Sequence, residues 1–136
     1  MKKRKLQVER YQSKNLPTIW LTRVGEHWIT QSDYLIEVPV RNESLLIPIG
    51  FRFDLASVPR WAWTLIAPFE LSLIAPLVHD YFYSLDGAKR IPGWDSPVTR
   101  EEADEIFLAL MLIEGVPKWK AHLAYRAVRL ASWIWW

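Results

Sequence analysis

The sequence predicts an α+β fold, with a small antiparallel sheet of about four strands followed by three main helices. Two observations lead to this prediction. Runs of β-branched and aromatic residues separated by short turns lie between Thr18 and Ile49, whereas the start and stop signals of the main helices lie beyond Leu71. Strands and helices that are segregated along a chain are typical of this class, because a parallel sheet requires the two to alternate.

Four strands are expected from two hairpins, over residues 18–22 with 27–30 and residues 34–40 with 44–49. Gly25 lies in the short turn of the first hairpin. Pro39 and Pro48 place the strands of the second hairpin at an edge or at a bulge, because proline cannot donate a hydrogen bond to a ladder. From Gly50 onward, we expect the chain to leave the sheet.

Three main helices are expected, over residues 72–85, 99–113 and 117–133, with the start of the first somewhere between 72 and 76. Asp86-Gly87 supplies a turn after the first helix. Thr99 and Glu102 form a capping box that opens the second helix. Apolar residues recur at helical spacing along the third, in a stripe wide enough to pack against the rest of the protein.

One domain is expected from the length and the composition. The chain has 136 residues, of which 51% are hydrophobic, enough for a single core. We predict that this domain covers residues 16–136 and that residues 1–15 form a flexible basic tail. The net charge of +2 leaves the folded body close to neutral, so the tail is the part suited to contact with nucleic acid or another anionic surface.

Neither an export signal nor a membrane span is expected. The basic start is followed by residues 6–12, which contain no apolar region of a signal peptide. Pro68, Glu70 and Pro76 interrupt the apolar runs, so none reaches the roughly 20 apolar residues of a transmembrane segment. These features predict a soluble protein.

Tryptophan is unusually frequent, with nine in the chain. Three of them close the sequence, at Trp133, Trp135 and Trp136. Two interpretations are open. Either these side chains cover the sheet or the core, or they form an exposed aromatic patch that docks on a partner or at a membrane interface, where tryptophan is enriched.

The residues that carry chemistry centre on His79 and Asp80. This polar pair lies inside an apolar and aromatic run, where an imidazole or a carboxylate without a partner would be strongly disfavoured. Asp104 lies three positions before Phe107 on a core-facing stripe, so it is predicted to face inward, towards the preceding helix. We therefore predict that Asp54, His79, Asp80 and Asp104 converge in one pocket or buried cluster.

A second set of residues is predicted to surround these four, because their charges or hydroxyl groups suit them to orient or neutralise the acids: Arg52, Ser57, Arg60, Tyr83 and Arg100. Arg100 shares a helix face with Asp104 and can pair with it, and Arg52, Arg60 or Arg100 could neutralise the acids. Ser57 has a simpler explanation as the N-cap of a short helix that begins at Pro59, since nothing local resembles a nucleophile elbow.

Two interpretations of the predicted cluster are open. In the first, His79, Asp80 and Asp104 bind a divalent metal, which would lower the pKa of a bound water and allow hydrolysis near neutral pH. The absence of cysteine leaves only histidine and carboxylates as ligands. In the second interpretation, arginines neutralise the acids in a buried network that ties the elements together.

Three segments in this order and spacing resemble a known family: Gly50-Phe51-Arg52-Phe53-Asp54-Leu55-Ala56-Ser57-Val58-Pro59-Arg60, His79-Asp80-Tyr81-Phe82-Tyr83, and Thr99-Arg100 with Ala103-Asp104 and Phe107. The chain is similar, over roughly residues 50–129, to the phage- and bacteria-associated family catalogued as domain of unknown function 1353. That family has a Phe-x-x-Asp-x-x-Ser-x-Pro-Arg segment before a His-Asp-Tyr-x-Tyr segment and an Ala-Asp-x-x-Phe helix. Phe53 and Phe82 depart from its usual pattern without removing a polar group.

The resemblance implies a small protein of phage or prophage settings, in the host cytoplasm or the virion. Its motif residues map to Asp54, Ser57, Pro59, His79, Asp80 and Asp104.

Two functions remain as alternatives. The first is a phage-type structural or accessory protein, with a buried His/Asp cluster and a C-terminal contact surface at Trp133, Trp135 and Trp136 for a virion or assembly protein. The second is a metal-assisted hydrolase that acts on cell wall or nucleic acid through His79, Asp80, Asp104 and Asp54.

Overall fold

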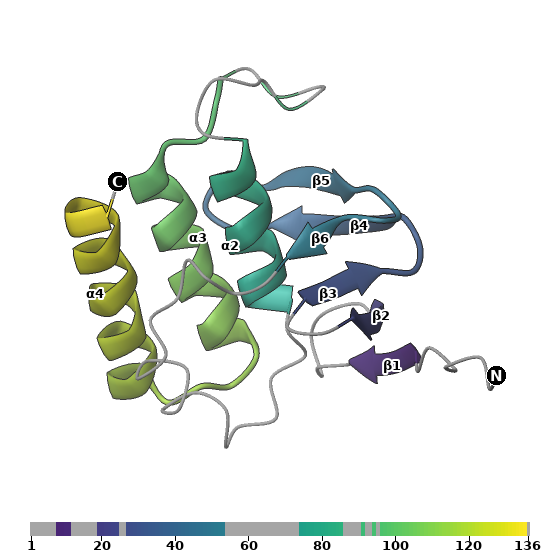
Figure 1. Cartoon of the computed structure of the whole chain (residues 1–136). Coiled ribbons are helices and arrows are strands. Elements are labelled where there is room, and N and C mark those ends of the chain that lie inside the picture. The colour runs from purple at the N-terminus through teal and green to yellow at the C-terminus, as the bar shows by residue number, and fades with distance from the viewer. Residues whose placement is uncertain are drawn as a thin grey trace, which may run out of the picture.

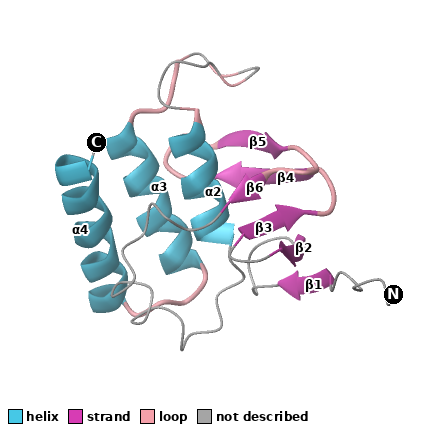
Figure 2. Ribbon diagram, in the orientation of Figure 1, coloured by secondary structure: helices cyan, strands magenta, loops and turns pink. Residues whose placement is uncertain are grey.

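The computed structural model describes residues 8–11, 19–24, 27–53, 74–85, 91, 94 and 96–135. Strands come first: β1 (Val8–Tyr11), β2 (Ile19–Val24), β3 (His27–Thr30), β4 (Tyr34–Val38), β5 (Glu43–Ile47) and β6 (Arg52–Phe53). Helices follow: α2 (Ile74–Ser84), α3 (Arg100–Ile113) and α4 (Lys118–Trp135). The strands lie on one side of the molecule and the helices on the other (Figure 1, Figure 2). The predicted α+β class is confirmed.

The described strands form two antiparallel sheets. One has the order β1-β2-β3-β6, and the other pairs β4 with β5. The two predicted hairpins are β2–β3 and β4–β5. β1, in contrast, lies within the stretch expected as a flexible tail and pairs with β2 along its whole length. An edge strand can form through backbone hydrogen bonds to one neighbour alone. It therefore does not require the alternating apolar pattern by which strands are predicted from sequence.

A tight corner returns the chain to the first sheet after β5. The Thr30 hydroxyl donates to the Pro48 carbonyl oxygen at 2.8 Å and accepts from the Phe51 N–H at 2.9 Å. Gly50, at φ 82°, donates its N–H to the Thr30 carbonyl oxygen at 2.9 Å, in a conformation that side chains disfavour. β6 therefore pairs with β3, and the expectation that the chain leaves the sheet at Gly50 is wrong. The contact that makes the corner joins residues far apart in the sequence.

The three described helices lie side by side, with α3 between α2 and α4 and with α2 next to the strands (Figure 1). One hydrophobic core joins these layers. It includes Ile36 and Leu45 from the inner face of β4–β5, Leu77 from α2, Phe107 from α3 and Val128 from α4. Among the described helices, none is both long and apolar enough to cross a membrane.

The start of α3 follows the predicted capping signal. Thr99 has extended backbone angles, φ −75° and ψ 162°, and its hydroxyl accepts the N–H of Glu102 at 3.1 Å. The helix ends at Ile113, and Gly115 takes the left-handed conformation at φ 95° just beyond it. Helices α2 and α4 also lie within a few residues of their predicted bounds. Local signals were therefore sufficient to predict the helical half.

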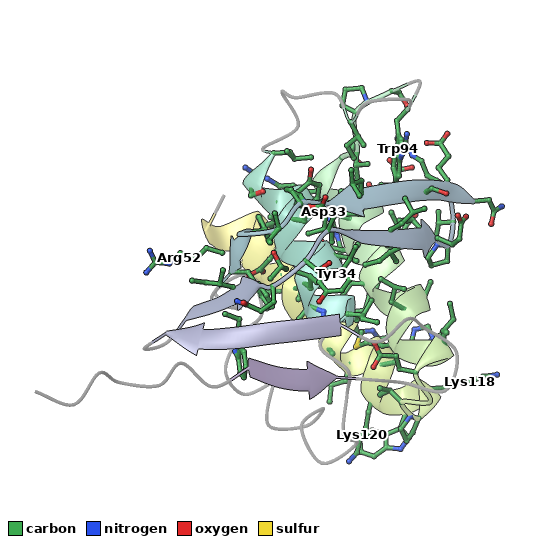
Figure 3. All side chains as sticks on the ribbon, turned by 90° about the vertical axis from the view of Figure 1, so that its right-hand side faces the viewer. Asp33, Tyr34, Arg52, Trp94, Lys118 and Lys120 are labelled. Atoms are coloured by element: carbon green, nitrogen blue, oxygen red, sulfur yellow. The ribbon has the colours of Figure 1, made fainter. Side chains whose placement is uncertain are left out.

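Arg41 attaches the tip of the β4–β5 hairpin to the start of α3. Its guanidinium forms a bidentate ion pair with the Glu102 carboxylate, at 2.7 Å from Nε and 2.6 Å from Nη2. It also donates to the carbonyl oxygens of Ser96 and Pro97, at 2.9 Å each. The indole of Trp94, labelled in Figure 3, lies with its ring centre 5.3 Å from the guanidinium carbon. These contacts set the position of α3 relative to the second sheet.

The turn that carries Arg41 has an unusual backbone. Val40 lies at φ 73° and Asn42 at φ 55°, both in the left-handed region. Asparagine tolerates this region, but a β-branched residue there costs on the order of 1–3 kcal/mol. The contacts of Arg41 offset that cost, because they fix the turn to Glu102 of α3 and to the segment just before that helix.

We expect acid to weaken the attachment of the hairpin to α3. Hydrogen bonds from Arg41 hold the pKa of Glu102 below its ordinary value of 4.5; burial raises it, whereas the charge of Arg41 and the Thr99 backbone N–H lower it further. Since the pKa is lower in the folded than in the unfolded chain, Glu102 contributes stability above about pH 4.5, which is lost as the pH falls through the folded-state pKa. Glu102→Gln should therefore flatten the dependence of unfolding free energy on pH below about 5, measured by urea denaturation.

Arg41→Met provides the matching control. It removes the other half of the same pair and should flatten the pH dependence over the same range. A Glu102→Gln variant that retains the full acid dependence of the wild type would show that another group is responsible.

Candidate functional site

Asp104 lies at the centre of a buried polar cluster. Its Oδ1 atom is 2.6 Å from His79 Nε2 and accepts a hydrogen bond from the Tyr83 hydroxyl at 2.7 Å. Its Oδ2 atom accepts from Arg129 Nη1 at 2.8 Å. Asp104 and His79 are both 0% exposed. We call these four residues, Asp104, His79, Tyr83 and Arg129, the Asp104 cluster.

Each of the three helices contributes to the Asp104 cluster. His79 and Tyr83 lie one turn apart on α2, with ring centres 4.3 Å apart. The His79 ring also packs against Phe107 of α3, at 4.8 Å between centres. Asp104 comes from α3 and Arg129 from α4. The single carboxylate therefore joins α3 to both of its neighbours.

The contact with Asp104 affects the charge of Arg129. Burial alone would lower the pKa of the Arg129 guanidinium, but the hydrogen bond to Asp104 and the charges of Asp104 and Glu101 raise it above its ordinary value. Arg129 is thus a permanent cation beside the Asp104 carboxylate. An ionised carboxylate only accepts hydrogen bonds, so His79 donates its Nε2–H to Asp104.

The predicted meeting of Asp104 with His79 and Tyr83 is thus present in the structure, whereas the contacts of the Asp104 carboxylate with described residues come from His79, Tyr83 and Arg129 and not from Asp80. Asp80 is only half-buried on α2. A guanidinium that pairs with Asp104 comes from Arg129 of α4, which was not one of the predicted candidates Arg52, Arg60 and Arg100. The Oδ1 atom of Asp104 faces α2 and its Oδ2 atom faces α4, so a guanidinium from α4 lies within hydrogen-bonding distance.

Arg52 lies away from the Asp104 cluster (Figure 3). Arg52 is exposed on β6 and points away from the body of the protein (Figure 3). Asp54, Ser57 and Arg60 lie outside the described residues, so their predicted roles stay predictions. The side chains of Trp133, Trp135 and Trp136 are likewise outside those described.

The described part of the cluster suits a hydrogen-bonded network better than a divalent metal. His79 Nε2 and Asp104 Oδ1, two of the predicted ligand atoms, are bonded to each other, and a guanidinium occupies Oδ2. A divalent cation at Oδ2 would be repelled by Arg129. Among the described residues, no three histidine or carboxylate side chains gather where a metal ion could be held.

Arg129 was not among the residues singled out from the sequence. The available signal was its position: it directly follows Val128, which is buried on the core-facing stripe of α4. A basic residue at the border of such a stripe can bury its stem and reach a carboxylate on the neighbouring helix. The spacing of residues on α4 cannot identify which carboxylate, because that depends on how α4 packs on α3.

Comparison with known proteins identifies the family to which the chain belongs. Residues 28–128 match the family described as "Protein of unknown function (DUF1353)". The chain belongs to this family. The predicted membership is therefore confirmed, and the matched region includes His79, Tyr83 and Asp104 but ends one residue before Arg129.

One curated relative has a much longer chain. "Uncharacterized protein y4jT" of Sinorhizobium fredii (strain NBRC 101917 / NGR234) is 34% identical over 84 residues, which are 60% of this chain and 22% of the relative. The matched stretch thus spans about a fifth of the length of that relative. No solved structure matches the chain.

Proposed function

We propose that this protein is a phage- or prophage-type accessory protein that acts by association with a partner and not by catalysis. In this proposal, the Asp104 cluster holds the three helices in place. The observation that carries it is the contact set of Asp104: both carboxylate oxygens are bonded within the protein, and neither Asp104 nor His79 is exposed.

Burial of this kind favours a structural role over a catalytic one. A general base has to come within hydrogen-bonding reach of the proton that it removes. The His79 ring lies between the rings of Tyr83 and Phe107, and its Nε2 atom is directed at Asp104. Networks of buried charges commonly hold elements in register, and here one carboxylate does so for three helices.

The association itself is proposed to use the C-terminal end. Trp133 and Trp135 belong to the last turns of α4, which lies at the outer edge of the helical layer (Figure 1). Tryptophan is enriched in the contact regions of proteins. The curated relative is consistent with a module that works alongside other parts, since its matched stretch lies within a longer chain.

The hydrolase remains the second candidate because of one observation. The 2.6 Å contact between His79 and Asp104 is also the arrangement by which a carboxylate orients a histidine for acid–base chemistry. In this alternative, Asp54 and Asp80 would complete the site, with a divalent metal supplying the activated water.

Two substitutions of His79 distinguish the candidates. His79→Ala should lower the free energy of unfolding by about 1–3 kcal/mol, because it removes a donor from a buried carboxylate. His79→Gln retains an amide N–H for Asp104 but cannot act as a base, so it should recover part of that stability and support function like the wild type. Urea denaturation measures the first effect, and complementation of cells lacking the gene measures the second.

The opposite pattern would support the hydrolase. A His79→Gln protein that is as stable as the wild type but inactive would contradict the accessory role, as would a metal that is retained through purification and lost in Asp80→Ala. Deletion of residues 133–136 tests whether the C-terminal end is needed for association with a partner. It should abolish complementation while the urea denaturation of the core stays unchanged.

A further inference from the structure

One face of α4 is exposed to solvent along most of the helix. Trp119, His122, Arg126 and Leu130 are spaced three or four residues apart, and all are exposed. Trp119 is 63% exposed and Leu130 is 57% exposed. We call these four residues the outer face of α4. The opposite face carries small and apolar residues that are buried against α3.

The charge of α4 is entirely positive. Its 18 residues include Lys118, Lys120, Arg126 and Arg129 but no aspartate or glutamate. Arg129 is paired with Asp104, whereas Lys118 and Arg126 are exposed. Lys118 and Lys120 project from the first turn of the helix (Figure 3), and the Lys120 ammonium lies 5.2 Å from the centre of the Trp119 ring.

One acid of α3, Asp104, pairs with Arg129 in the second half of α4. Burial and then the charge of Glu105 raise the pKa of Tyr125, with smaller effects of Asp104 and Glu101. Arg129 lies one turn further on and lowers the same pKa. Lys118, Lys120 and Arg126 all precede Arg129 on α4, so three of the four basic residues of the helix lie before the one that is paired with Asp104.

We propose that the outer face of α4 docks on the anionic surface of a phospholipid membrane. Arg126 on this face, together with Lys118 and Lys120 at the start of the helix, would attract the lipid phosphates. Tryptophan favours the interfacial region of a bilayer, and an exposed leucine gains from contact with the acyl chains just below it. This inference is independent of the accessory role and of the Asp104 cluster.

The combination of residue types favours a membrane over nucleic acid. Phosphate backbones and bases would also bind cations and stack on Trp119. They offer no apolar surface for Leu130, which is as exposed as Trp119 and lies eleven residues further along the same face. That separation is about 16 Å of helix, so α4 would lie flat on the membrane.

The test is sedimentation of the full chain with vesicles. Vesicles of phosphatidylcholine alone are compared with vesicles that contain about one-third phosphatidylglycerol, at low salt and at about 0.5 M NaCl, where charges are screened. Binding is expected only to the anionic vesicles, and it should fall at high salt. Arg126→Gln should lower the partition coefficient about fivefold and Trp119→Ala about tenfold.

Leu35→Ala and Leu46→Ala are matched controls. These leucines are 63% and 54% exposed and face each other across the β4–β5 hairpin. Helices α2 and α3 separate this hairpin from α4 (Figure 1). Both variants should bind like the wild type, and circular dichroism checks that every variant is folded. Equal binding to both vesicle types, no binding to either, or equal effects of the control and α4 variants would overturn the proposal. A DNA mobility shift that needs Trp119 and Arg126, without vesicle binding, would assign the face to nucleic acid instead.

Discussion

Asp104→Ala is expected to lower the free energy of unfolding by about 3–5 kcal/mol, the range for breaking a buried ion pair on one side. The substitution leaves three donors without their acceptor: His79 Nε2, the Tyr83 hydroxyl and the Arg129 guanidinium. His79 is 0% exposed, so water cannot replace the lost hydrogen bond unless the helices move apart. Urea denaturation monitored by circular dichroism measures the loss.

Glu105→Ala is the matched control for Asp104→Ala. It removes a carboxylate from the next position of α3, where the side chain is exposed, and should change stability by less than about 0.5 kcal/mol. Asp104→Asn should fall between the two, because it keeps an oxygen for one neighbour but loses the charge that Arg129 requires. If Asp104→Ala were no more destabilising than Glu105→Ala, the cluster would have no part in holding the helices.

Arg129→Leu is expected to be the second-largest effect, at about 2–4 kcal/mol. It leaves the Oδ2 atom of a fully buried carboxylate without its cation. The loss should be smaller than for Asp104→Ala because the Arg129 side chain is 30% exposed, and solvent can compensate part of the change. Thermal and urea denaturation of the variant measure this effect.

Arg126→Leu is the control for Arg129→Leu, since it removes an exposed arginine three residues earlier on the same helix. Its effect should be close to zero. The double variant Asp104→Ala/Arg129→Leu tests the pair directly. It should be less destabilised than the sum of its single variants by about 1–3 kcal/mol, and strict additivity would contradict the proposed coupling.

Local signals in the sequence predicted the helical half of the protein well. Thr99 and Glu102 mark the start of α3 because a capping hydroxyl and its N–H partner lie within one turn of each other. The inward position of Asp104 follows from its place on the same stripe as Phe107. Its contact with His79 follows from the packing of two helices that are consecutive in the chain.

The sheet was predicted less completely because its pairing depends on contacts between distant residues. The corner around Thr30 and Gly50 adds β6 to the first sheet, although nothing near β6 in the sequence indicates it. β1 carries no hydrophobic signal because it forms an edge. Arg41 belongs to a two-stranded hairpin yet finds its carboxylate in α3.

By itself, the sequence determined the α+β class, the bounds of the helices and the inward direction of Asp104 and His79, because periodicity and capping act within one or two turns of a helix. Only the tertiary structure decided which cation neutralises Asp104. Arg100 lies one helical turn before it, but Arg129 comes from a different helix and pairs with it at 2.8 Å. The packing of α4 on α3 brings the two groups together, and that packing results from many apolar contacts among residues far apart in the chain.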